Sequence, residues 1–123
     1  MFMNVELMVD EKLIRGDVRT PEGDGPFPTV CFYHGFCVDR IGIMRLHELF
    51  ARKCVENGIA CVKFDFYGCG ESDGDFSEMR YLDEIEQAKA IYNWTPGSCL
   101  RSMLRSIIFL CRRFGRPTVP GRF

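Results

Sequence analysis

Two short segments of the chain hold the residues best suited to chemistry. The first is residues 33–36 (YHGF), and the second is the glycine-rich run 65–74 (DFYGCGESDG). Each follows directly on an apolar run that is typical of a strand buried on both faces of a parallel sheet. Ligand sites in open α/β sheets lie beyond the carboxyl ends of the strands. Both segments are therefore expected at one edge of a sheet.

Ser72 lies within residues 70–74 (GESDG), which match the G-x-S-x-G pattern of a nucleophilic serine on a tight strand-to-helix turn. That arrangement requires a strand immediately before the serine and a helix immediately after it. Here the preceding strand is expected to end near Phe66, and residues 75–80 separate the serine from the next helix. We therefore predict that Ser72 is a loop residue and not a nucleophile.

The hydrophobic pattern predicts the elements that must position these two segments. The expected strands are 5–9, 13–20, 29–33 and 59–66, and the expected helices are 43–57 and 81–94. The unit from Thr29 to Phe66 is a strand, a helix and a strand, so its two strands are expected to be parallel neighbours. This order predicts the beginning of an α/β sheet.

The first helix is expected to pack against the sheet through one apolar face. The positions that recur at helical spacing are Leu46, Phe50, Cys54 and Val55. Charged residues of the same segment, Glu48 among them, are expected on the surface. Gly58 is expected to end the helix.

Together the two segments resemble the beginning of an α/β-hydrolase: a strand ending in HGF, a helix, and a strand ending in D-x-x-G-x-G-x-S-x-G. The variant is similar to bacterial ester hydrolases of the cinnamoyl or feruloyl esterase type, over roughly residues 4–94. The resemblance implies an α/β fold comprising strands one to four, in the spatial order 1-2-4-3, and two helices, truncated after them. It also implies a serine ester hydrolase that forms an acyl-enzyme from a small-molecule ester without a cofactor.

The resemblance assigns a role to each segment. The backbone N–H of Phe36 is expected to form half of an oxyanion hole, because a fixed amide dipole stabilises the negative charge that acyl transfer builds on oxygen. Gly35 is expected to let the backbone approach the substrate, with a plain tight turn as the alternative, and His34 is expected to be structural. The residues of the second segment expected to be structural are Asp65, Gly68, Gly70, Ser72 and Gly74.

The catalytic triad of such an enzyme is not expected in this chain. Serine, carboxylate and histidine would all follow the second helix, yet the residues after Trp94 contain no His, Asp or Glu. Residues 1–94 are therefore expected to be an inactive N-terminal portion of the domain. The strand 29–33 would then lack an outer neighbour and expose its edge.

Residues 95–123 differ sharply in composition from the rest. They hold six Arg and no acid, whereas all 17 acidic residues precede them. Three interpretations stay open: a basic amphipathic extension that lies on an anionic membrane, a helix that caps the exposed strand edge, and a frameshifted translation. Frameshift or truncation is favoured, because the shifted frame permits a G-x-S-x-G. The competing functions are a non-catalytic binding or membrane-surface module using this tail, and a partner that supplies half a site to another chain.

Composition narrows the class of protein further. A chain of 123 residues, with 46% hydrophobic residues and a net charge of −1, suits one small globular domain. No apolar run suits a membrane span, and the N-terminus has no basic region typical of a signal peptide. The seven cysteines include no CxxC pair, which indicates reduced thiols and a cytoplasmic protein. With only two histidines a zinc site is not expected, and the acidic folded part argues against nucleic-acid binding.

Overall fold

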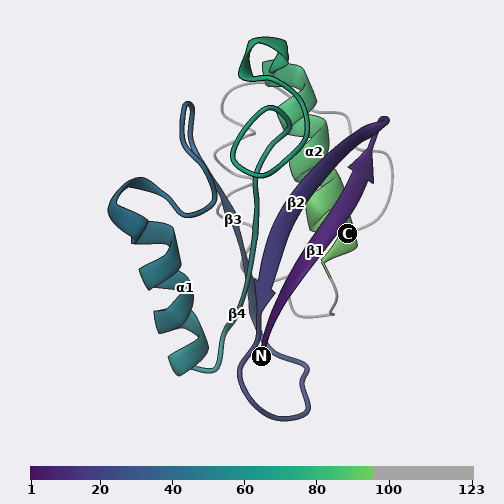
Figure 1. Ribbon diagram of the computed structural model, residues 1–123. Helices are drawn as coiled ribbons and strands as arrows, with labels where there is room; N and C mark the ends of the chain where they lie inside the picture. Colours follow the sequence, from purple (N-terminus) through teal and green to yellow (C-terminus); the bar gives the residue numbers. More distant parts are fainter. Residues whose placement is uncertain (96–123) are drawn as a thin grey trace, which may run out of the picture.

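The computed structural model describes residues 1–95. They form a four-stranded sheet in the order β1-β2-β4-β3, flanked by two helices (Figure 1). The elements are β1 (Phe2–Val9), β2 (Lys12–Arg19), β3 (Thr29–Tyr33), η1 (Ile43–Arg45), α1 (Leu46–Glu56), β4 (Ala60–Phe64), η2 (Phe76–Glu78) and α2 (Tyr81–Trp94). β3 and β4 are parallel, and the other neighbours are antiparallel. The α/β class, the strand order and the parallel pair are therefore as predicted.

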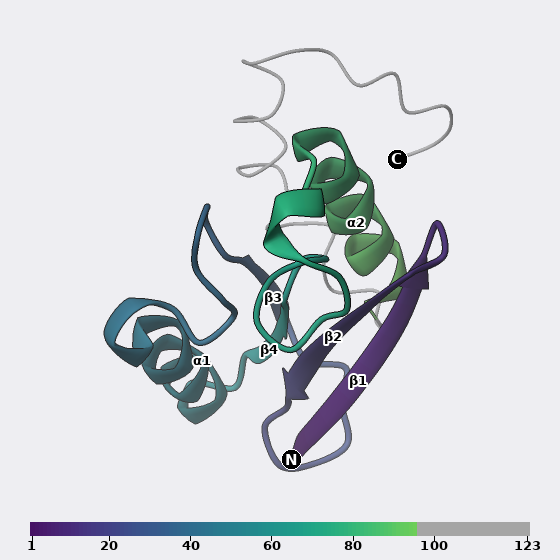
Figure 2. The same cartoon turned by 45° about the horizontal axis from the view of Figure 1, so that its top comes forward.

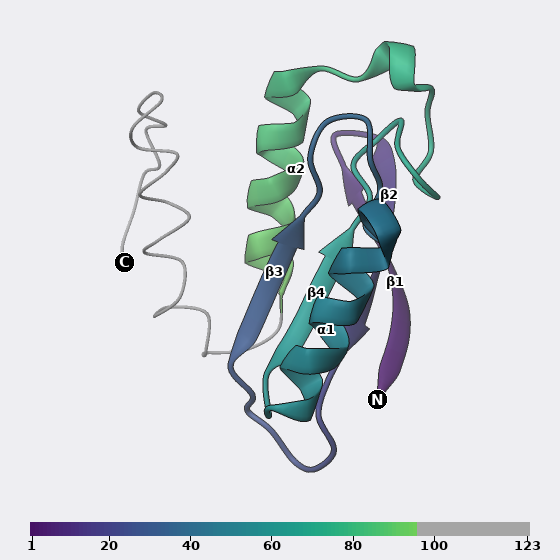
Figure 3. The same cartoon turned by 90° about the vertical axis from the view of Figure 1, so that its left-hand side faces the viewer.

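The two helices cover opposite faces of the sheet, as Figure 3 shows. Successive side chains of a strand point to opposite faces, and β4 is buried along its whole length. Cys61 packs with Ala51 of α1 in one cluster, whereas Val62 and Phe64 belong to a larger cluster with Ile91 of α2. Burial on both faces explains why β4 is almost continuously apolar in sequence.

The first strand is longer than its hydrophobic pattern indicates. Pairing with β2 begins at Phe2, three residues before the predicted start at Val5. Only Val9 of this strand is fully buried, so no alternation marks its first residues. Asp10 and Glu11, with φ of 47° and 63°, close the hairpin in the left-handed conformation that suits the twist of two antiparallel strands.

The first helix begins later than the predicted residue 43. Met44 and Arg45 have φ of 53° and 61°, so the chain forms only the turn η1 before α1 starts. A left-handed residue breaks the hydrogen-bond ladder of a right-handed helix. The second helix has the predicted bounds.

The buried face of α1 differs from the predicted one. Leu46 and Phe50 are 64% and 45% exposed, and the side chains that face the sheet are Glu48, Ala51 and Cys54. The prediction placed Glu48 on the surface and was wrong. The Glu48 carboxylate is buried because cations of β2 and β4 contact it between the helix and the sheet. The helical periodicity of the sequence does not reveal these contacts.

The strand β4 ends at Phe64, two residues before its predicted end at Phe66. The Asp65 N–H still donates to Arg15 O at 2.9 Å, but its side chain turns to the neighbouring loop. Within residues 1–95, β3 pairs with β4 alone. No helix of this part is long and apolar enough to cross a membrane. The interpretations of the Arg-rich tail concern residues 95–123, of which all but Thr95 lie outside the described part.

Candidate functional site

The loops that follow β3 and β4 lie at the same end of the sheet (Figure 2). They enclose an open hollow of about 390 Å³. Its lining residues are Cys37, Val38 and Asp39 from the first loop and Gly68, Cys69, Gly70 and Phe76 from the second. The two segments singled out in the sequence are thus brought together, as expected for the carboxyl ends of parallel neighbouring strands.

His34 connects the two loops from inside. Its ring is buried, and Nε2 accepts a hydrogen bond from the Phe66 N–H at 3.0 Å. Nδ1 lies 2.9 Å from Gly35 O, where it can only donate. Both ring nitrogens are therefore occupied in the neutral form. In this arrangement His34 holds the backbone of the two loops together and has no nitrogen left for a substrate.

Phe36 is not itself among the residues that line the hollow, but it directly precedes Cys37, which is. The Phe36 side chain is 73% exposed, and its ring stacks at a tilt on Phe76, with centroids 5.4 Å apart. The Phe36 N–H donates no hydrogen bond to any of the described residues. A Cβ added to Gly35 would meet only Val38 Cγ2, at 4.0 Å, and Gly35 is not among the positive-φ glycines. The described chain therefore gives no steric reason for a glycine at this position.

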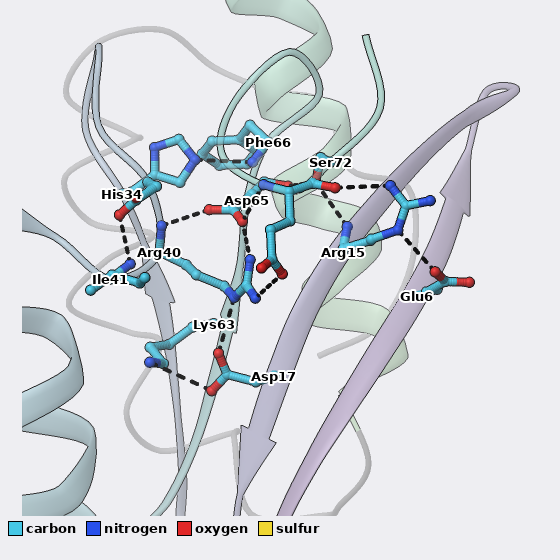
Figure 4. Close-up of polar contacts among 12 residues, drawn as sticks. Glu6, Arg15, Asp17, His34, Arg40, Ile41, Lys63, Asp65, Phe66 and Ser72 are labelled. Carbon is cyan, nitrogen blue, oxygen red and sulfur yellow. Dashed lines mark hydrogen bonds and ion pairs between the residues drawn. The ribbon is translucent and has the colours of Figure 1, made fainter.

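Arg40 clamps the first loop onto the second (Figure 4). Its backbone N–H donates to Asp65 Oδ1 at 2.6 Å, and its guanidinium contacts the other oxygen of the same carboxylate. Nη2 lies 2.5 Å from Glu71 Oε2, and Nε lies 3.1 Å from Asp17 Oδ2 of β2. We call these four residues the interloop clamp. It fixes the loop that carries Phe36 relative to the sheet.

The centre of the clamp, at Asp65 and Arg40, is nearly inaccessible to water, whereas the Glu71 side chain is 71% exposed. Asp65 and Arg40 have side-chain exposures of 1% and 11%. Burial by itself lowers the pKa of Arg40, but hydrogen bonds and charges from Glu71 and Asp65 raise it above its ordinary value. A hydrogen bond from Arg40 lowers the pKa of Glu71. No sequence pattern pointed to Arg40, because a single arginine in a polar loop is ordinary.

Three positions of the second loop require glycine for steric reasons. Gly70 has φ of +53°, and a Cβ there would lie 2.3 Å from the Asp65 carboxyl carbon of the clamp. Gly68 has φ of +81°, and its Cβ would lie 2.6 Å from Asp75 O. Gly74 has φ of +91°, and its Cβ would meet the Tyr67 ring at 2.3 Å. These three positions hold the loop in its conformation.

Ser72 fastens this loop to the sheet. Its hydroxyl donates to Asp65 O at 2.6 Å and accepts from the Arg15 N–H of β2 at 2.8 Å. Helix α2 begins only at Tyr81, so Ser72 has neither the strand before it nor the helix after it that a nucleophile elbow needs. In this geometry Ser72 joins three backbone segments, in line with the predicted loop role.

Replacing Ser72 by alanine is expected to lower the free energy of unfolding by about 1–3 kcal/mol, because Arg15 N–H and Asp65 C=O lose a partner in two partly buried hydrogen bonds. Urea denaturation measures this. Ser77→Ala, at an exposed serine, is the matched control, with an expected change within about 0.5 kcal/mol. The wild-type chain should show no turnover of p-nitrophenyl acetate. Turnover that Ser72→Ala abolishes would contradict the loop role.

A second group of buried charges lies beneath the site, between α1 and the sheet. Lys63 of β4 is 1% exposed, and its Nζ lies 2.9 Å from Glu48 Oε2 and 3.5 Å from Asp17 Oδ1. Arg19 Nη2 lies 2.6 Å from Glu48 Oε1. Asp17 also belongs to the interloop clamp, so the two groups are continuous. A lysine in an otherwise apolar strand is a sequence signal for such a buried partner, and it was missed.

The chain is similar in sequence to two known proteins. No protein-family model matches the chain. Two Escherichia coli proteins, each described as an uncharacterized 31.7 kDa protein in the traX-finO intergenic region, are 33% identical to it over 90 residues. This match covers 71% of the chain, and the chain spans only about 30% of the length of these curated relatives.

Solved structures also match most of the chain. Est1E from Butyrivibrio proteoclasticus, with ferulic acid bound, superposes with a TM-score of 0.68 at 21% identity, over 73% of this chain and 36% of Est1E. The Pyrococcus furiosus esterase Pf2001 gives 0.62 at 22% identity, over 76% and 35%. Mouse alpha/beta hydrolase domain-containing protein 10 gives 0.62 at 21% identity, over 77% and 36%. The described residues therefore have the fold of the N-terminal portion of an α/β-hydrolase.

Proposed function

We propose that this chain supplies the N-terminal half of the pocket of a serine ester hydrolase. The Phe36 N–H is the first oxyanion donor of that pocket, and the substrate is a small-molecule carboxylic ester. The observation that carries the proposal is an amide without a partner among the described residues, next in sequence to Cys37, which lines the hollow. The bound ferulic acid of Est1E and the esterase Pf2001 favour an ester as the substrate class.

The position of this amide is supported by two independent connections. The His34 ring accepts a hydrogen bond from the Phe66 N–H, so the residue just before Gly35 is linked to the loop after β4. The interloop clamp links Arg40 to Asp65. A preorganised donor stabilises a developing oxyanion because it needs no reorientation during the reaction. The unfilled space above Gly35 leaves room for a carbonyl oxygen to approach the backbone.

The remaining catalytic groups would have to come from sequence that this chain does not contain. After Glu86 the 123 residues hold no further Asp or Glu, and the last His is His47. A serine on a separate elbow, a histidine base and a carboxylate would complete the acyl-enzyme chemistry. Hydrolysis of an ester is therefore a property of the completed pocket and not of this chain by itself.

A chimera tests the proposal. Residues 1–95 replace the matching N-terminal third of the Pf2001 esterase, and hydrolysis of p-nitrophenyl acetate is measured. Phe36→Pro, which removes the N–H, should lower kcat by about 10²–10³. Phe36→Ala, which keeps the N–H, is the matched control and should stay within about tenfold of the parent chimera.

Equal kcat values for the proline and alanine variants would overturn the proposed role of the amide. Thermal unfolding is recorded for every chimera, so that a folding defect is separated from a catalytic one. If the full exchange does not fold, residues 34–42 alone are grafted into the esterase and the same two variants are compared.

A further inference from the structure

Two cysteines line the hollow from opposite sides, and neither has a part in the proposed function. Cys37 follows Phe36 and is exposed, whereas Cys69 lies between two glycines of the second loop and is 8% exposed. Both are free thiols. The other cysteines within residues 1–95 are Cys31, Cys54 and Cys61, all buried in the sheet or against α1.

The two thiols have different surroundings, and for that reason we expect Cys37 to react before Cys69. Burial raises the pKa of Cys69, and the nearby Glu84, Asp65 and Cys37 raise it further, so Cys69 stays a protonated thiol. Cys37 is open to solvent, and a small oxidant reaches it first. Both residues line the same hollow, Cys37 from the first loop and Cys69 from the second.

Both residues lie on loops and not on paired strands. A disulfide requires Cα atoms about 4.4–6.8 Å apart. Cys37 has φ of 59° within an exposed turn, and Cys69 is flanked by Gly68 and Gly70, both with positive φ. Formation of a disulfide therefore requires the two loops to bring these Cα atoms within that range. The interloop clamp and the His34 bridge keep the two loops adjacent meanwhile.

We propose that a peroxide joins Cys37 and Cys69 in a disulfide that closes the hollow. The Cys37 thiolate attacks one peroxide oxygen and the O–O bond breaks, so that hydrogen peroxide gives Cys37 sulfenic acid and hydroxide. The hydroxide becomes water by taking up the proton that the Cys37 thiol released. The Cys69 sulfur then attacks the sulfenic sulfur, releasing water as Cys69 loses its proton. Two thiols are oxidised by two electrons, and one peroxide is reduced to two waters.

This modification site lies directly beside the Phe36 amide. A covalent link there would cover the mouth of the hollow and exclude a ligand from it until a thiol reductant restores both cysteines. The inference does not depend on the proposed function, because it concerns only the position and chemistry of the two thiols.

The test uses the full chain, reduced and then treated with hydrogen peroxide. Free thiols are blocked with N-ethylmaleimide, and non-reducing tryptic peptides are sequenced by tandem mass spectrometry. The expected product links peptide 20–40, through Cys37 and not Cys31, to peptide 64–80, which contains Cys69. It should be lighter than the two reduced peptides by two hydrogen atoms and be reversed by dithiothreitol.

Matched variants and one denatured control complete the test. Cys69→Ser should leave a Cys37 sulfenic acid that dimedone traps, whereas Cys37→Ser should leave Cys69 unoxidised. Oxidation in guanidinium should give mixed pairings among the seven cysteines, showing that the native pairing requires the fold. Native-state oxidation that stops at Cys37 with Cys69 still alkylatable, or that pairs Cys37 with another cysteine, overturns the proposal.

Discussion

Lys63→Met is expected to lower the free energy of unfolding by about 3 kcal/mol, within the roughly 3–5 kcal/mol range for breaking a buried ion pair. Methionine fills the volume of the lysine stem but removes one cation from Asp17 and Glu48, both of which also contact Arg19. Both carboxylates are buried, and Asp17 Oδ1 accepts no hydrogen bond from the described residues even in the wild type. Urea denaturation of the 123-residue chain, followed by circular dichroism, measures the change.

Lys53→Met is the matched control for this substitution. Lys53 is also a lysine in an ion pair, with Glu56 at 2.6 Å, but its side chain is 75% exposed. Water screens such a surface pair, so the expected change is below about 1 kcal/mol. Equal effects of the two substitutions would show that the Lys63 network contributes nothing beyond a surface contact.

The same network predicts how stability depends on acid. Burial by itself raises the pKa of Glu48, but hydrogen bonds from Lys63 and Arg52 lower it from 4.5 to about 2. The folded-state pKa lies below the unfolded one, so this contribution to stability is present above about pH 4.5 and is lost as the pH falls toward 2. Lys63→Met should reduce this loss of stability on acidification, and an unchanged pH profile would contradict the assignment.

Gly68→Ala is expected to lower the free energy of unfolding by about 3 kcal/mol or more. Two effects add at this position: alanine in the left-handed conformation costs about 1–2 kcal/mol, and a steric clash typically costs about 1–3 kcal/mol. The clash is with the backbone oxygen of Asp75, 2.6 Å from the added Cβ, so no side-chain rotation relieves it. Thermal and urea unfolding both report the change.

Gly58→Ala separates the two effects. Gly58 has φ of +77°, nearly that of Gly68, but a Cβ there meets nothing within 4 Å. Its expected cost is therefore the conformational one alone, about 1–2 kcal/mol. If both substitutions lower the free energy of unfolding equally, the close approach of Gly68 to the η2 segment contributes nothing to the cost of Gly68→Ala.

Local patterns in the sequence were sufficient for most of the fold. The helix 81–94 and the strand 29–33 were predicted with their observed bounds, because each has a hydrophobic period or a continuous apolar run with clear stops. The start of α1 and the first residues of β1 were missed. The start of α1 depends on two left-handed residues, Met44 and Arg45. The first residues of β1 pair with β2 without being buried, so they carry no hydrophobic pattern.

The sequence by itself determined that the HGF and DFYGCGESDG segments follow two parallel strands and so share one end of a sheet. Only the tertiary structure decided what joins them, namely the His34 ring on Phe66 and Arg40 on Asp65, and what fastens the second segment to the sheet, namely Ser72 on Arg15. It also decided that Glu48 lies inside against Lys63. The physical reason is the separation in sequence over which each kind of interaction acts. Periodicity reports which face of an element is buried, whereas a buried charge is stabilised by partners far away in sequence, whose positions exist only once the chain has folded.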